Sequence, residues 1–175
     1  RPASPAETVA LVPAAALSWH RVELPAGLHK QPARWQAALQ GLLEDRLLDD
    51  PNQLHLALQP DWHNLPRPWV AVCDRAWLSA HLQALEQAGL QVHCIVPELH
   101  PPSDTAPTRI TALGDADSGW LWVSHAERGV WGQTFNTETP HLAALGLSDE
   151  ERALAVTQAE PGVVQALSDR MDLPA

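Results

Sequence analysis

The stretch WVAVCDRAWLSAHLQALEQAGLQVHCIVP, residues 69–97, predicts a strand, a helix and a second strand, and this order decides the fold class. WVAVCD is a continuous apolar run, typical of a strand buried on both faces. Asp74 suits a helix N-cap, and Gly89 suits the position that stops the helix. Such a unit normally closes as a right-handed parallel crossover, so we expect an α/β fold. The helical stripe comprises Trp77, Leu78, Leu82, Leu85 and Ala88.

Upstream, RWQAALQGLLEDRLLDDPNQLHLAL (34–58) predicts an amphipathic helix, a turn at Asp50-Pro51-Asn52 and an alternating strand. Before it, TVALVP (8–13) and ALSWHRVELP (16–25) are each typical of a short strand that ends at a proline. The helix should bury its apolar stripe, including a large tryptophan ring. That stripe comprises Trp35, Ala38, Leu39, Leu42, Leu43 and Leu47.

A proline-rich segment, HPPSDTAPT (100–108), marks a linker, because three prolines can neither pair as a strand nor continue a helix. We therefore expect a first α/β subdomain over 1–99 and a second over 109–175. The second should begin with three strands, RITALGD, GWLWVSH and GVWGQTF. A short helix near 139–145, a further segment at 149–158 and a final helix from Pro161 should follow. Strands followed by helix and strand thus recur in two halves with mixed sheets.

The tryptophan-rich hairpin of the second half allows a prediction of register. If Ala126 pairs with Gly129, opposed residue numbers sum to 255. One face of the ribbon then carries Trp120, Trp122, Trp131 and Phe135, and the other carries Leu121, Val123 and Val130. Both faces would be apolar, so we expect a sandwiched ribbon of core aromatics rather than a ligand platform.

Charge and composition exclude several classes of function. Lys and Arg total 11 against 21 Asp and Glu, a net charge of −10, which disfavours nucleic acid and anionic lipid as partners. No apolar run approaches the roughly 20 residues of a membrane-spanning helix. The chain begins at Arg1 in a proline-rich lead without an initiator methionine, so we expect an internal piece of a longer protein.

No pattern of catalytic, cofactor or metal-binding residues stands out. The nine histidines lack metal-ligand spacing, and Cys73 and Cys94 lie in apolar runs that favour an inert thiol. Asp115 and Asp117 could be imagined as metal ligands or as part of a phosphate turn, but two acids oppose phosphate binding, and a polar hairpin turn is favoured. The phosphate-binding and dinucleotide glycine motifs are both absent from the chain. We therefore expect no enzyme activity, no cofactor and no metal.

Acidic residues crowd the expected C-terminal end of the 34–50 helix, where the helix dipole disfavours negative charge. A charged helix end is often only solvated. It can also dock a basic surface of another protein, with a gain in encounter rate. The candidate partner-binding residues are Glu44, Asp45, Arg46, Asp49 and Asp50.

Several elements together resemble the cytoplasmic domain of type II secretion system protein L, the GspL family. The resembling stretches are LVPAAALSWHRVELP, ALQGLLEDRLLDDPNQLHLAL and WVAVCDRAWLSAHLQALEQAGLQVHCIVPE, in the family's order. The likeness covers most of residues 9–98 and is looser over 109–175. Relative to the family, this chain lacks the earliest strands and the transmembrane helix, as a fragment of the cytoplasmic part would.

The resemblance implies an actin-like, ribonuclease-H-like fold and a non-enzymatic platform adaptor at the cytoplasmic face of the bacterial inner membrane. It implies recruitment of the secretion ATPase (GspE family) through that ATPase's N-terminal domain and coupling to pseudopilus assembly. Protein M, the platform protein F and a second copy of the chain are the other implied partners. Because the same frame hosts ATPases, kinases and the nucleotide-binding PilM kind of pilus assembly protein, these stay as alternatives.

Overall fold

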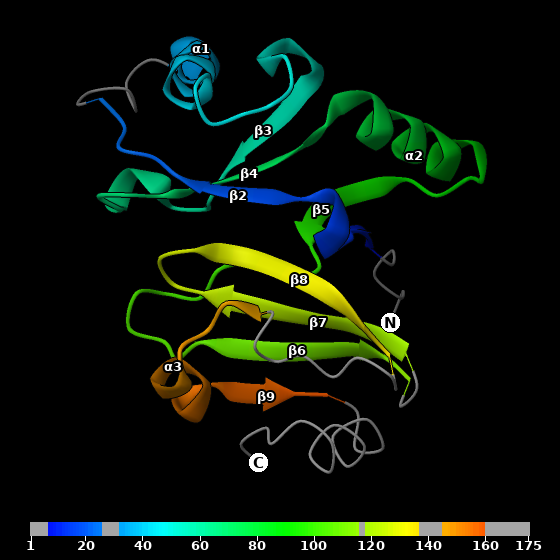
Figure 1. Ribbon diagram of the computed structural model, residues 1–175. Helices are drawn as coiled ribbons and strands as arrows, with labels where there is room; N and C mark the ends of the chain where they lie inside the picture. Colours follow the sequence, from blue (N-terminus) through cyan, green and yellow to red (C-terminus); the bar gives the residue numbers. More distant parts are fainter. Residues whose placement is uncertain (1–6, 26–31, 116–117, 137–144, 160–175) are drawn as a thin grey trace, which may run out of the picture. The chain divides into compact units, whose positions relative to one another are not determined.

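The computed structural model describes residues 7–25, 32–115, 118–136 and 145–159 (Figure 1). The final helix expected from Pro161, most of the short helix near 139–145, and Asp117 lie outside these ranges. The chain divides into two compact units, residues 1–98 and 99–175, and each is described by itself. In the described ranges, no helix is long and apolar enough to span a bilayer.

The first unit is built on a three-stranded antiparallel sheet. Its central strand is β4 (Trp69–Asp74), flanked by β2 (Ser18–Arg21) and β3 (Leu54–Leu58). Alternation places Val70 and Val72 on the face that also carries Leu56. Helix α1 (Pro32–Leu43) packs against this face with the fully buried side chains of Leu39 and Leu43. Trp35 packs against this core as the stripe predicts, but its ring is only partly buried.

A parallel pair, β1 (Thr8–Val12) with β5 (Val92–Pro97), forms the second sheet of this unit. The 69–97 stretch was expected to close as a right-handed parallel crossover, but its two strands belong to different sheets. Both edges of β4 are occupied, by β2 and by β3, so β5 pairs with β1 instead. Helix α2 (Arg75–Gln87) still contacts both β4 and β5, and a small core forms around Val12, Cys73 and Leu78.

The predicted ends of α2 are confirmed. The Asp74 carboxylate accepts a hydrogen bond from the Trp77 backbone N–H at 2.6 Å, which makes it the N-cap. Gly89 follows the helix with φ +79°, a conformation that costs glycine little.

Strand β5 carries one irregularity in its pairing. Thr8 pairs with Val92 and Val9 with Cys94, so His93 is an extra residue in the ladder. The Thr8 N–H donates a hydrogen bond to Nδ1 of the His93 ring at 3.3 Å. Beyond Pro97 the Glu98 N–H donates to the Val12 carbonyl, which continues the ladder by one bond.

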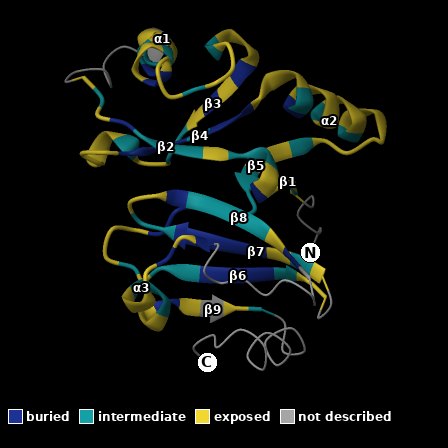
Figure 2. Ribbon diagram, in the orientation of Figure 1, coloured by how far each residue is buried: buried dark blue, intermediate teal, exposed yellow. Residues whose placement is uncertain are grey.

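The second unit contains a four-stranded sheet in the order β8-β7-β6-β9. Strands β6 (Arg109–Gly114), β7 (Ser118–His125) and β8 (Gly129–Asn136) are antiparallel neighbours. The predicted 149–158 segment comprises helix α3 (Asp149–Leu154) and strand β9 (Val156–Gln158), which runs parallel to β6. Figure 2 shows the buried residues concentrated along β6 and β7. The core comprises Ile110, Ala112, Leu121, Val123, Phe135, Leu145, Leu147 and Ala155.

The register predicted for the β7–β8 hairpin is wrong by one residue. His125 pairs with Gly129, so opposed numbers sum to 254 and the loop has three residues, 126–128. The His125 ring accepts hydrogen bonds from the N–H groups of Glu127 and Arg128, and Gly129 takes φ +87°. A slip of one residue moves a whole set of side chains to the opposite face.

The corrected register separates the aromatic residues that were expected to share a face. Phe135 lies in the core with Leu121, and Trp131 packs against that core. Trp120 and Trp122 lie on the opposite face of the ribbon, where their rings stack at a centroid distance of 5.2 Å.

Glu151 in α3 connects this helix to the β7–β8 turn. Its carboxylate accepts a hydrogen bond from the Ser148 N–H at 2.7 Å, completing a capping box, and another from the Arg128 guanidinium at 2.8 Å. The His125 ring lies 3.3 Å from the same carboxylate. The hydrogen bond from the Ser148 backbone holds the pKa of Glu151 below its ordinary value of 4.5. The Ser148 hydroxyl, the Arg128 guanidinium and the His125 ring contribute in the same direction, and desolvation opposes the shift.

Replacing Glu151 by glutamine should make the second unit less stable at pH 7, because glutamine keeps the cap but loses the charge. Because the folded-state pKa of Glu151 is lower than its unfolded value near 4.5, the ionised carboxylate stabilises the folded unit at pH values above 4.5. This stabilisation is lost as the pH falls through the folded-state pKa. The difference in denaturation midpoint between wild type and variant should therefore be present at pH 7 and should shrink steadily below pH 4.5. The exposed neighbour substitution Glu150→Gln is the control, and an equal effect from it would contradict this role.

Candidate functional site

The candidate partner-binding residues lie in and beyond a turn that follows α1. The helix ends at Leu43, whose carbonyl accepts hydrogen bonds from the N–H groups of Arg46 (2.8 Å) and Leu47 (3.0 Å). Glu44 and Asp45 directly follow the last helical residue, as expected. Asp49 and Asp50 do not lie at the helix end, because the chain has already turned away from the helix axis.

Two of the five candidates have structural roles in this turn. The Arg46 guanidinium donates to the Arg21 carbonyl at 2.8 Å and so ties the turn to β2. The Asp50 carboxylate accepts a hydrogen bond from the Asn52 N–H at 2.9 Å, which caps the 3-10 turn Pro51–Gln53. The other three acids are exposed, and within the described residues none of the three has an ion-pair partner. These are Glu44, Asp45 and Asp49.

Leu48 lies among these acids and is fully exposed, at 105% of its reference area. Leu47, its neighbour, is partly buried against the first-unit core. The predicted apolar stripe of the helix included Leu47 but not Leu48. Two adjacent leucines cannot both lie on one helix face, so the pair itself was a signal that one of them is exposed. An exposed leucine with acids on either side is a suitable anchor for a partner that is both apolar and basic.

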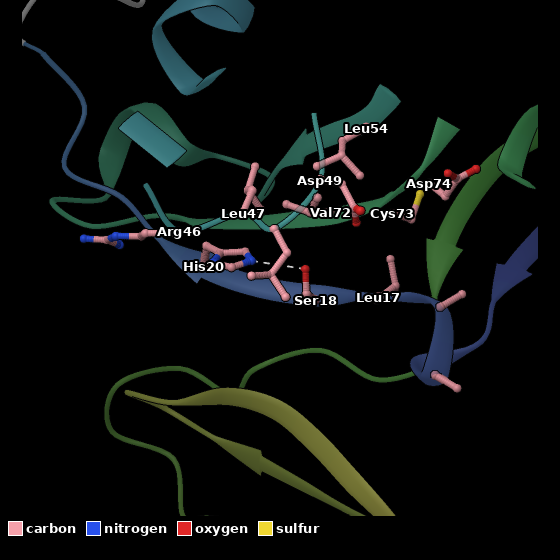
Figure 3. A pocket seen from close by; sticks show the side chains of 13 residues that line it. Leu17, Ser18, His20, Arg46, Leu47, Asp49, Leu54, Val72, Cys73 and Asp74 are labelled. Atoms are coloured by element: carbon pink, nitrogen blue, oxygen red, sulfur yellow. Dashed lines mark hydrogen bonds between the residues drawn. The ribbon is translucent and has the colours of Figure 1, made fainter. Parts of the chain in front are cut away.

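A cavity of about 370 Å³ opens beside this turn (Figure 3). Its apolar walls come from β3, β4, the 15–17 segment and Leu47, and the Ser18 hydroxyl meets the His20 ring at 3.1 Å inside it. Arg46, Leu48 and Asp49 border it, so the cavity and the acidic turn form one continuous surface. The lining comprises Ala15, Ala16, Leu17, Ser18, His20, Arg46, Leu47, Leu48, Asp49, Leu54, Val72, Cys73 and Asp74.

Two titratable side chains that line this cavity have shifted pKa values. Burial, and secondarily the Arg46 guanidinium, hold the pKa of His20 below its ordinary 6.5, so its ring is neutral at pH 7. Burial, and secondarily the Asp74 carboxylate, raise the pKa of the Cys73 thiol, which keeps it protonated and weakly nucleophilic. Within the described ranges, no three His, Cys, Asp or Glu side chains gather closely enough to hold a metal ion.

Asp115 has a local role in the β6–β7 turn. Its carboxylate accepts a hydrogen bond from the Ser118 N–H at 2.9 Å, and the Asp115 N–H donates to the Ser118 carbonyl at 3.0 Å. This geometry is that of a polar hairpin turn, the interpretation that the sequence favoured.

A family model described as "Type II secretion system (T2SS), protein L" matches residues 2–129. The type II secretion system protein L of Dickeya chrysanthemi is 31% identical over 121 residues, and that of Klebsiella pneumoniae is 32% identical over 118. These alignments cover 69% and 67% of this chain but 26% of each relative, so the chain spans about a quarter of their length.

Two solved structures are similar in fold. The cytoplasmic domain of EpsL, described as an inner membrane component of the type II secretion system of Vibrio cholerae, matches with a TM-score of 0.61 at 24% identity, over 95% of this chain and 74% of that one. The PilM–PilN type IV pilus biogenesis complex matches with a TM-score of 0.50 at 13% identity, over 94% of this chain and 67% of that one. These likenesses confirm the predicted actin-like α/β fold.

Proposed function

Because this chain belongs to the type II secretion system protein L family, we propose that it is a non-enzymatic adaptor that recruits the secretion ATPase to the inner-membrane platform. The ATPase would bind through its N-terminal domain at the cytoplasmic face of the inner membrane, and the adaptor would couple its work to pseudopilus assembly. Protein M, platform protein F and a second copy of the chain would be its further partners in the assembly.

The observation that carries this proposal is the surface formed by Leu48 with Glu44, Asp45 and Asp49, here called the acidic turn. It combines one fully exposed apolar side chain with three exposed carboxylates that have no ion-pair partner among the described residues. Interfaces commonly place an apolar anchor inside a polar rim, and complementary charge speeds the encounter. The ATPase surface that fits here is apolar at its centre and basic around it.

A non-enzymatic role is supported by the chemistry of the described residues. The cavity beside the acidic turn holds a neutral histidine and a protonated thiol, neither of which is arranged as a base–nucleophile pair. The chain also contains no glycine-rich phosphate-binding motif. These features favour a surface that binds another protein.

Reversing the three exposed acids of the acidic turn together, as Glu44→Lys, Asp45→Lys and Asp49→Lys, should weaken capture of the purified ATPase N-terminal domain about tenfold or more at low salt. The loss should shrink as salt rises, because exposed charges are screened. Affinity measured by biolayer interferometry over a salt series tests this.

The matched control reverses three exposed acids away from the acidic turn, Glu7, Glu86 and Glu150, and changes the net charge by the same amount. Equal affinities of the two triple variants would show that only overall charge matters and would remove the acidic turn as the docking surface. Absence of any binding by the wild-type chain would overturn the adaptor function itself.

A further inference from the structure

The cavity beside the acidic turn lies against the first-unit core, next to Leu54 and Val72, which are 6% and 3% exposed. Helix α1 covers the β2-β4-β3 sheet only as far as Leu43, the last residue of the helix. The same sheet face continues to Ser18, Val72 and Leu54, all of which line the cavity. Its volume of about 370 Å³ falls within the range of about 300–1,000 Å³ that is usual for ligand pockets.

The apolar walls determine which chemical group this cavity suits. Leu17, Leu47, Leu54 and Val72 surround the space, and Figure 3 shows the Ser18 hydroxyl directed at the His20 ring within it. A charged group placed against these apolar walls would lose its hydration, since the charged lining residues are only Arg46, Asp49 and Asp74. An aliphatic or aromatic side chain would instead gain from leaving water.

The charges at the border determine what should accompany that side chain. Arg46 is held by the Arg21 carbonyl, so its guanidinium belongs to the fold of the turn. Asp49 lines the cavity, is exposed and has no ion-pair partner within the described residues. Glu44 and Asp45 add negative charge on the same turn, so an arriving segment is favoured if it carries Lys or Arg next to its apolar residue.

We propose that this cavity receives an apolar side chain from a basic segment of the ATPase N-terminal domain, with a Lys or Arg of that segment against Asp49. This inference rests on the proposed adaptor function and specifies how the partner is held. Leu48 lies at the cavity border, so the contact of the partner would continue from Leu48 into the cavity without a gap.

Filling the cavity from this chain tests the inference. Ser18→Leu places an aliphatic group in the cavity and leaves Leu48 and every acid of the turn in place. Affinity for the purified ATPase N-terminal domain should fall about tenfold or more, and by the same factor at low and high salt, because a lost apolar contact is not screened. Ser79→Leu, on an exposed position of α2, is the matched control and should bind as wild type does.

Methyl NMR on the 175-residue chain supplies a second readout that does not depend on a substitution. Titration with the ATPase domain should shift the Val72 and Leu54 methyl signals and produce intermolecular NOEs to them, while the core methyls of Leu121 in the second unit stay unchanged.

The outcomes separate this inference from the adaptor function. If wild type binds the ATPase domain, but Ser18→Leu binds equally well and the Val72 methyls do not shift, the cavity is not the anchor site and the adaptor function still stands. NOEs between Leu48 and Val72 in the free chain would show that Leu48 itself occupies the cavity and would overturn the inference. If the wild-type chain does not bind the ATPase domain, the proposed adaptor function is contradicted.

Discussion

Replacing Leu39 by alanine should destabilise the first unit by about 2–5 kcal/mol, the usual cost of truncating a buried leucine. Its side chain has no exposed area and lies in the core between α1 and the β2-β4-β3 sheet. Denaturant unfolding with hydrogen exchange on the β4 amides would measure the loss and assign it to this unit. Leu48→Ala is the control: its side chain is fully exposed, so the change should stay within about 0.5 kcal/mol.

Equal effects of the two substitutions would contradict the packing of α1 on this sheet face. Trp35 packs against the same core but is only partly buried, whereas the Leu39 side chain is fully buried.

Replacing Phe135 by alanine should cost the second unit about 3–5 kcal/mol, the range for a buried aromatic side chain. Phe135 is 5% exposed and lies in the core with Leu121, and its ring packs so closely on Gly119 that a Cβ there would be 2.8 Å from it. Denaturant unfolding followed by hydrogen exchange on the β7 amides measures the loss.

Trp120→Ala is the informative control for this prediction, because the corrected hairpin register places Trp120 on the opposite face, 40% exposed. Its truncation should cost clearly less than that of Phe135. Equal costs, or strong coupling between the two positions in a double-mutant cycle, would instead support the face assignment with paired numbers that sum to 255.

Local patterns were sufficient to predict most of the helices and strands of the described chain. The 69–97 stretch shows both strands, the helix and its Asp74 and Gly89 ends, because capping and periodicity depend on residues close together in sequence. Strand partners depend on the whole sheet. No pattern within 69–97 reveals that β2 and β3 occupy both edges of β4, and this occupancy is why β5 pairs with β1.

The hairpin register failed for a different reason. A two-residue and a three-residue loop are both compatible with the residues 125–129, and the difference depends on the His125 ring accepting hydrogen bonds from two loop N–H groups. At the candidate site, the sequence revealed a cluster of acidic residues, but it did not reveal that helix α1 ends at Leu43. That end moves Asp49 away from the helix, exposes Leu48 and leaves the cavity open.

The irregularity at His93 limits how other chains can attach to β5. Because the Glu98 N–H points toward β1, alternation along the regular part of the strand turns the Ile95 N–H outward, and Pro97 has no N–H to offer. The extra residue at His93 also disturbs the regular spacing of backbone groups at the start of β5. Among the described residues, the edge of β5 that faces away from β1 therefore offers few regularly spaced N–H donors, which disfavours pairing with a further strand.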